Sequence, residues 1–136
     1  MGKAPLLLAF ALGACQQAAE PEKPETRFIQ DGRMALQSVE GHDVIVEELD
    51  IDAGLDVETH KHAGPEILTV VEGSATLQLE GEAPMVLAAD KTFHIPRETY
   101  HRATIGPDGA KIIVIRIHPR GDEVHIAPDR EVVFPE

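Results

Sequence analysis

The chain has 136 residues, which is enough for one domain and leaves little room for a second domain. Its formal net charge is −12 and it has no long basic run, so electrostatics disfavour nucleic acid or an anionic lipid surface as a partner. Hydrophobic residues make up 43% of the sequence but aromatic residues only 4%, so the core must be aliphatic. With 11 Gly and 10 Pro, this composition favours short strands separated by turns over a helical bundle.

The first fifteen residues differ in kind from the rest. Lys3 is followed by an apolar run from Leu6 to Ala14 and then by Cys15, the only cysteine of the chain. The run is too short to span a bilayer, but a charged start, an apolar middle and small residues are typical of a secretory signal. Residues 12–15, LGAC, resemble a bacterial lipobox, whose cysteine is lipidated and becomes the new N-terminus. The alternative is a chance cysteine after a buried apolar segment.

The sequence thus predicts a lipoprotein signal peptide over residues 1–14 and a lipid on Cys15. Residues 16–26, QQAAEPEKPET, contain no apolar residue larger than alanine and indicate a solvated tether over 15–26. We expect a protein of the bacterial cell envelope that faces the periplasm and touches the membrane only through this lipid. Without a second cysteine, thiolate metal ligands and a cysteine nucleophile are excluded.

The remainder, residues 27–136, reads as one all-β domain. Apolar runs bounded by turn residues predict strands at 44–51, 66–71, 75–81, 84–89, 91–96 and 111–119. Glu72-Gly73-Ser74 is predicted to be the turn of a hairpin between the second and third of these. No ten-residue stretch shows a convincing helical repeat, so short, evenly spaced strands favour an antiparallel sandwich or barrel.

The segment GLDVETHKHAGPEILTVVEG, residues 54–73, carries two histidines and a glutamate at a spacing suited to a metal ion. In a strand, His60 and His62 point to the same side and Lys61 points to the other. Glu66 follows a short Ala-Gly-Pro turn that can return its carboxylate toward the imidazoles. Imidazole and carboxylate together suit Fe, Mn, Co, Ni, Cu or Zn.

These spacings resemble the first motif of the cupin family, from Gly54 through the two histidines and Glu66 to Gly73, without departure. The segment DKTFHIPRETYHRATI, residues 90–105, resembles the second motif. Pro96 and His101 match it, whereas Asp90 and Glu98 replace its two glycines and Ile105 replaces its asparagine. Glu98 raises the expectation that the loop there has a different shape.

The resemblance implies a cupin (jelly-roll-like) β-barrel with four metal ligands at His60, His62, Glu66 and His101. It implies one divalent transition metal, with Fe or Mn favoured and Ni, Zn, Cu and Co open, and a small molecule as substrate or ligand. Dioxygenase-like oxidation, decarboxylation and lyase or isomerase steps are among the family's reactions. Cupins often pair through their sheets, so a homodimer is a further expectation.

The sequence gives weaker indications of a function for the other polar residues. Glu66, His94 and His118 are weak candidates for a catalytic acid or base, and the two histidines are better explained as structural. His42 and His125 are predicted to be solvated, and Arg116 to face outward between Ile115 and Ile117. The acidic run Glu47-Glu48-Asp50-Asp52 is predicted to be a solvated strand face, because it lacks the spacing of a calcium loop.

Three functions remain open on the sequence. The first is a mononuclear metalloenzyme, dioxygenase-like or decarboxylase/lyase-like, in the cell envelope. The second is a cupin module that binds a metal or a small ligand without turnover, or a metal-free pocket in which the four polar side chains bond to one another. The third is an envelope interaction protein, disfavoured because the sequence indicates no large apolar or aromatic patch.

Overall fold

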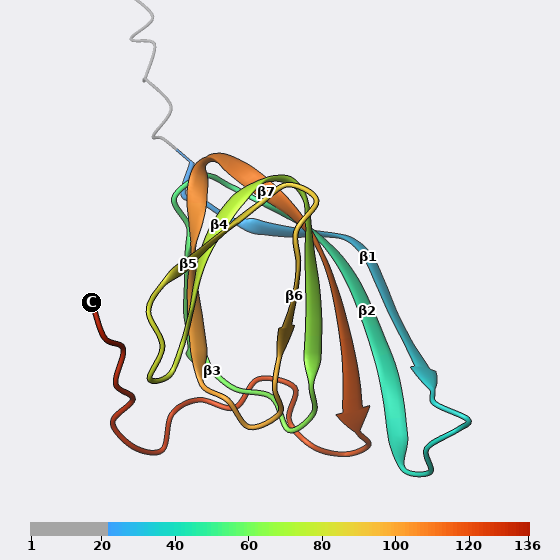
Figure 1. Ribbon diagram of the computed structural model, residues 1–136. Coiled ribbons are helices and arrows are strands. Elements are labelled where there is room, and N and C mark those ends of the chain that lie inside the picture. Colours follow the sequence, from blue (N-terminus) through green and yellow to red (C-terminus); the bar gives the residue numbers. More distant parts are fainter. Residues whose placement is uncertain (1–21) are drawn as a thin grey trace, which may run out of the picture.

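The structure is a computed structural model that describes residues 22–136. The predicted signal peptide, Cys15 and most of the tether lie outside these residues. The described residues form seven strands, β1 (Thr26–Ala35), β2 (His42–Ile51), β3 (Asp56–His60), β4 (Glu66–Leu79), β5 (Met85–Ala88), β6 (Thr92–Ile95) and β7 (His101–Pro119). Their arrangement in space can be followed in Figure 1. The described part of the chain contains no helix long and apolar enough to cross a bilayer. Because all the elements of the described residues are strands, the all-β prediction is confirmed.

All strand pairs are antiparallel and form one curved sheet that wraps around a common interior (Figure 1). The main path runs β1-β2-β7-β4-β5, while β3 pairs with β7 and β6 pairs with β4. The central strand is the 19-residue β7, which pairs with β2, β3 and β4. The fold is thus the antiparallel β-barrel that the sequence led us to expect.

The predicted hairpin at residues 72–74 is wrong, because β4 continues through it as one strand of 14 residues. The register with β7 shifts on either side of this point, between Val70 and Glu72 and between Gly73 and Ala75. Gly73 has a φ of 73°, and a Cβ there would overlap the carbonyl oxygen of Gly109. The turn signal therefore marks a bulge that bends the strand, a common alternative use of glycine within a sheet.

Strand β1 was not predicted. Its apolar side chains are mostly exposed, with Phe28 and Met34 each 61% exposed and Ile29 52%. Backbone pairing with β2 holds the strand at the edge of the sheet. Because the side chains of β1 that the structure describes are exposed on both faces, the sequence carries no period-two pattern that could have revealed the strand.

The interior of the barrel is aliphatic, and β7 contributes to it at every second residue. Ile112 and Val114 are buried, while Ile113 and Ile115 on the other side are only partly buried. Twelve buried residues form the core cluster: Ile51, Leu68, Val70, Ala75, Leu77, Leu79, Leu87, Ile95, Ile105, Ala110, Ile112 and Val114. These side chains line the inside of the barrel, and the polar residues described below occupy one end.

The outside of the same sheet also carries apolar side chains. Cross-strand pairing aligns Val44 with Ile117, and Val46 with Ile115 and in turn with Ile67. We call this surface the outer sheet face and define it by Val44, Val46, Ile67, Ile113, Ile115 and Ile117. Ile67 is 40% exposed, so the face is open to solvent in the single chain.

Candidate metal centre

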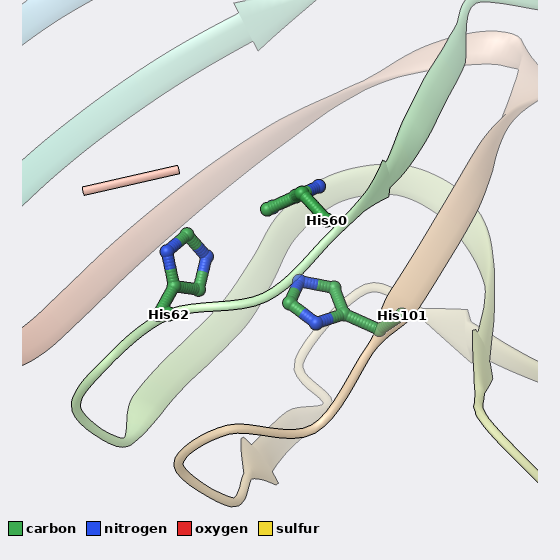
Figure 2. A group of neighbouring side chains, drawn as sticks. All are labelled: His60, His62 and His101. Atoms are coloured by element: carbon green, nitrogen blue, oxygen red, sulfur yellow. The ribbon is translucent and has the colours of Figure 1, made fainter. Parts of the chain in front are cut away.

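Three histidines lie together at one end of the barrel (Figure 2). His60 ends β3 and is paired in register with His101, the first residue of β7, while His62 follows two residues after His60. One nitrogen from each ring lies within 4.8 Å of the other two. The ring centroids of His60 and His101 are 4.3 Å apart, and those of His60 and His62 are 4.8 Å apart.

Each of the three rings is oriented by a hydrogen bond from Nδ1 to a backbone carbonyl. His60 donates to Glu58 over 2.7 Å, His101 donates to Thr99 over 3.0 Å, and His62 donates to Val124. A carbonyl oxygen can only accept, so Nδ1 carries the proton in the neutral ring and Nε2 keeps a free lone pair. Fixing the tautomer in this way is how proteins commonly present histidine to a metal.

The Nε2 atom of His62 gives a direct test of whether a metal fits. It is buried and has no hydrogen-bond partner. The nearest carboxylate oxygen, Oε2 of Glu66, lies 3.0 Å away but outside the hydrogen-bonding direction of the ring nitrogen. An unsatisfied buried polar atom costs about 1–3 kcal/mol, a cost that a coordinated cation would remove. The three neutral nitrogens therefore fit a divalent transition metal.

Glu66 is brought to the same end of the barrel but has other partners. It is the first residue of β4 and is only 5% exposed. Its Oε2 accepts a hydrogen bond from Nε of Arg116 over 2.6 Å and also lies beside His62. The compact group of nitrogens consists of the three histidines, and the Glu66 carboxylate stands next to it, held by the guanidinium.

The prediction that Arg116 faces outward is wrong. Arg116 is 4% exposed, and it also donates through Nη1 to the carboxylate of Glu47. Both sides of β7 are apolar here, so the flanking isoleucines gave no sign of which side was inside. Glu47 was predicted to be solvated and instead completes a buried chain of charges from Glu47 through Arg116 to Glu66.

The surroundings fix the charge of these groups. Burial by itself raises the pKa of Glu66, but contact with His62 and the charge of Arg116 outweigh it and hold the pKa at about 2. Burial lowers the pKa of His101 to about 4, with a further contribution from His60, and burial also lowers the pKa of His60. At neutral pH the carboxylate is ionised and both rings are neutral, which is the form that binds metal.

A fourth histidine, His125, is exposed, as predicted, but its ring also lies beside the group. Its ring centroid is 4.9 Å from that of His60 and 5.0 Å from that of His62. The residue is partly open to solvent, so it stands at the edge of the site. Nothing in the sequence pattern could have revealed it, because it belongs to a segment without regular structure.

That segment, residues 120–136, crosses the end of the barrel where the histidines lie (Figure 1). Lys61 and Ile126 exchange two backbone hydrogen bonds, of 3.0 and 2.9 Å. The hydroxyl of Tyr100 donates to Asp129 over 3.0 Å, which turns Tyr100 away from the histidines. Since Val124 also orients His62, this C-terminal segment is part of the site's framework.

A cavity of about 280 Å³ adjoins the histidines inside the barrel. Its walls are mainly aliphatic, and its polar end is formed by His60, His101, His125, Glu47, Glu66 and Arg116. A larger hollow of about 580 Å³ lies over β3 and β7, but none of the histidines lines it. The interior cavity is therefore the candidate for ligand binding, because it alone meets the metal ligands.

The remaining candidates lie elsewhere. His94 is exposed on β6, where the neighbouring Ile95 faces the interior. His118 is fully buried and bonds through Nε2 to the carbonyl of Asp122 over 2.9 Å, but it does not line the cavity. The structure brings together His60, His62, His101 and Glu66 and leaves these two histidines outside the group.

The two glycine positions replaced in the second motif keep the backbone that glycine favours. Asp90 has a φ of 67° and Glu98 a φ of 58°, so the expectation of a differently shaped loop at Glu98 is wrong. The Glu98 amide donates to the carbonyl of His62 over 2.9 Å, and its carboxylate pairs with Lys61 at 2.7 Å. These contacts hold the residue in a conformation that is uncommon for glutamate.

Solved structures with the same fold include a cupin and several enzymes. An RmlC-like cupin from Shewanella frigidimarina is 22% identical over 68% of this chain and 88% of its own, with a TM-score of 0.52. A structure of the DMSP lyases RdDddP and RnDddQII is 24% identical over 66% and 46%, with a TM-score of 0.54. Oxalate decarboxylase from Bacillus subtilis is 16% identical over 61% and 23%, with a TM-score of 0.53.

At these identities the likenesses establish the fold and nothing further. No curated protein matches the sequence. The cupin domain family, in contrast, matches residues 48–116, which is half of the chain and includes all three histidines and Glu66. The chain therefore belongs to the cupin family.

Proposed function

We propose that this cupin is a metal-dependent enzyme acting on a small, metal-chelating substrate. The observation that carries the proposal is the set of three buried or half-buried imidazoles, each oriented through Nδ1 and each offering its other nitrogen to the same space. A site of this kind has no evident structural purpose, because it leaves a buried nitrogen of His62 unsatisfied.

His60, His62 and His101 would hold the ion, and Glu66 is proposed as the fourth ligand. Nitrogen and carboxylate donors favour Fe or Mn in our proposal, with Ni, Zn, Cu and Co as alternatives. A bound divalent ion supplies Lewis-acid or redox chemistry to a chelating substrate. The aliphatic wall of the cavity would exclude water from that substrate, and His125 is placed to contact it at the edge.

One observation favours a second candidate, a cupin that binds a metal or small ligand without turnover. Glu66 is tied to Arg116 and has a pKa of about 2, so it is a weak base for moving a proton at neutral pH. The other carboxylate lining the cavity, Glu47, is also paired with Arg116. Under this alternative the same site recognises its ligand and leaves it unchanged.

Metal binding is tested with His60→Ala and His101→Ala, and with His94→Ala as a control that removes an exposed histidine. Each of the first two should lower the affinity for Co²⁺ or Zn²⁺ by more than about 100-fold, since one of three nitrogens is lost. Because burial lowers the pKa of His60, and lowers that of His101 to about 4, binding should persist below pH 6. Calorimetry and metal analysis report both effects, and equal affinity in all four proteins would contradict the site.

Turnover is tested by screening metal-loaded protein against chelating small acids, enols and catechols. We expect consumption of one class that depends on the metal and is lost in His101→Ala. Oxygen uptake and product analysis separate oxidation from decarboxylation and lyase chemistry. Tight binding without consumption in every class would favour the binding module.

We also propose that the protein is held in the bacterial cell envelope, facing the periplasm, by a lipid on Cys15. The support is the sequence pattern of residues 1–15. Cys15→Ser should move the protein from the membrane to the soluble fraction after cell fractionation. A variant that stays with the membrane as fully as the parent would overturn the anchor.

We further propose that two copies pair through the outer sheet face. Its support is the row of partly exposed aliphatic side chains from Val44 to Ile67, which a single chain leaves open to water. Ile115→Glu should halve the mass measured by light scattering. Val86→Glu, at a 71% exposed site on β5, is the matched control and should leave the mass unchanged.

A further inference from the structure

The polar end of the interior cavity contains one permanent cation and two carboxylates. Among the described residues, Arg116 is the only arginine or lysine that lines the cavity. Its Nε bonds to Glu66 over 2.6 Å, and its Nη1 bonds to Glu47. Two of the three guanidinium nitrogens of Arg116, Nε and Nη1, are therefore engaged with carboxylates of the protein.

This arrangement opposes a substrate with several negative charges. A dicarboxylate or sugar acid would use one oxygen pair on a metal and would need a second cation for its remaining charge. The only resident cation already serves two carboxylates, and these would repel a further anion a few ångströms away. No other arginine or lysine among the described residues lines the cavity to compensate a second negative charge.

The rest of the cavity opposes a substrate with many hydroxyl groups. The wall away from the polar end is built from aliphatic side chains, among them Leu49, Leu68, Leu77, Ile105 and Val114. A hydroxyl placed against them would lose its hydrogen bonds to water without replacement. The volume of about 280 Å³ is below the usual range for drug-sized ligands, which limits the occupant to a compact body.

We propose that the ligand of this site has one chelating polar end with at most one negative charge, attached to a compact apolar body. This inference rests on the proposed function, since it names the substrate class of the same site. It points to monoanionic or neutral chelators such as enols, enediols of low polarity and catechol-like rings. Oxalate, malate and sugar acids fall outside the class.

The first experiment compares probes on the Co²⁺-loaded full chain by calorimetry. Tropolone, which chelates as a monoanion with an apolar ring, is compared with oxalate and malate, which are dianions. Each affinity is divided by the probe's affinity for free Co²⁺, so that intrinsic chelation cancels. We expect the corrected ratio to favour tropolone by at least about ten-fold, as a difference of one uncompensated charge would give. Equal or tighter corrected binding of the dianions would overturn the inference.

A second experiment changes the charge beside Arg116 without touching the histidines. Glu47→Gln frees part of the guanidinium and should shift the corrected ratio toward oxalate by about ten-fold. Glu48→Gln is the matched control, since it removes the same charge from the neighbouring residue, which points to the other side of β2. Equal ratios in the two variants and the parent would show that Arg116 does not set the selectivity.

The two proposals can fail separately. If the protein binds Co²⁺ but prefers dianions, the metal site is supported and the proposed substrate class is wrong. For a chain that binds no Co²⁺, the inference is decided on the metal-free cavity by amide chemical shifts of Ala103, Ile105 and Ile112. Shifts produced by neutral catechol and not by oxalate support it, and the reverse, or no shifts with either probe, overturns it.

Discussion

Hydrogen bonding between β7 and three other strands connects the fold to the site. Strand β7 pairs with β4 along both of its halves, with β2 along its second half and with β3 at its beginning. Since alternate residues of a strand face opposite sides, the register that sends Ile112 and Val114 into the core also sends Arg116 to its polar end. In the first half of β7, beyond the register shift, Ile105 and His101 are the buried residues. A slip of one residue in β7 would therefore expose the core and dismantle the site together.

The backbone also decides how the site is assembled from near and distant parts of the chain. His60 and His101 are oriented by hydrogen bonds that their rings donate to carbonyls two residues earlier, so local structure suffices for these two rings. The ring of His62 instead donates to the carbonyl of Val124, 62 residues away. Two of the three rings are thus set as their strands form, whereas the third depends on the C-terminal segment lying across the barrel.

This division explains how much could be predicted from the sequence. His60, His62, His101 and Glu66 were found because their spacing within two short motifs reflects local geometry. Arg116 and Glu47 were misplaced because β7 is apolar on both sides. His125 is exposed as predicted, but its position beside the histidines was missed because it lies in a segment with no periodic pattern. The bulge in β4 was mistaken for a turn, since glycine serves both purposes. The interior charge chain and the edge of the site belong to tertiary structure, which spacing alone does not encode.

The backbone at Glu98 has a consequence for how such sites are recognised and how they diverge. A glycine in a family pattern stands for a φ angle, and Asp90 and Glu98 keep that angle with other side chains. A sequence pattern that requires glycine at these positions rejects such proteins, whereas a pattern that requires only a positive φ accepts them. The carboxylate of Glu98 forms an ion pair with Lys61, which lies between His60 and His62 in the sequence. A substitution at this loop position can therefore change how firmly the segment carrying His60 and His62 is held, although every metal ligand is unchanged.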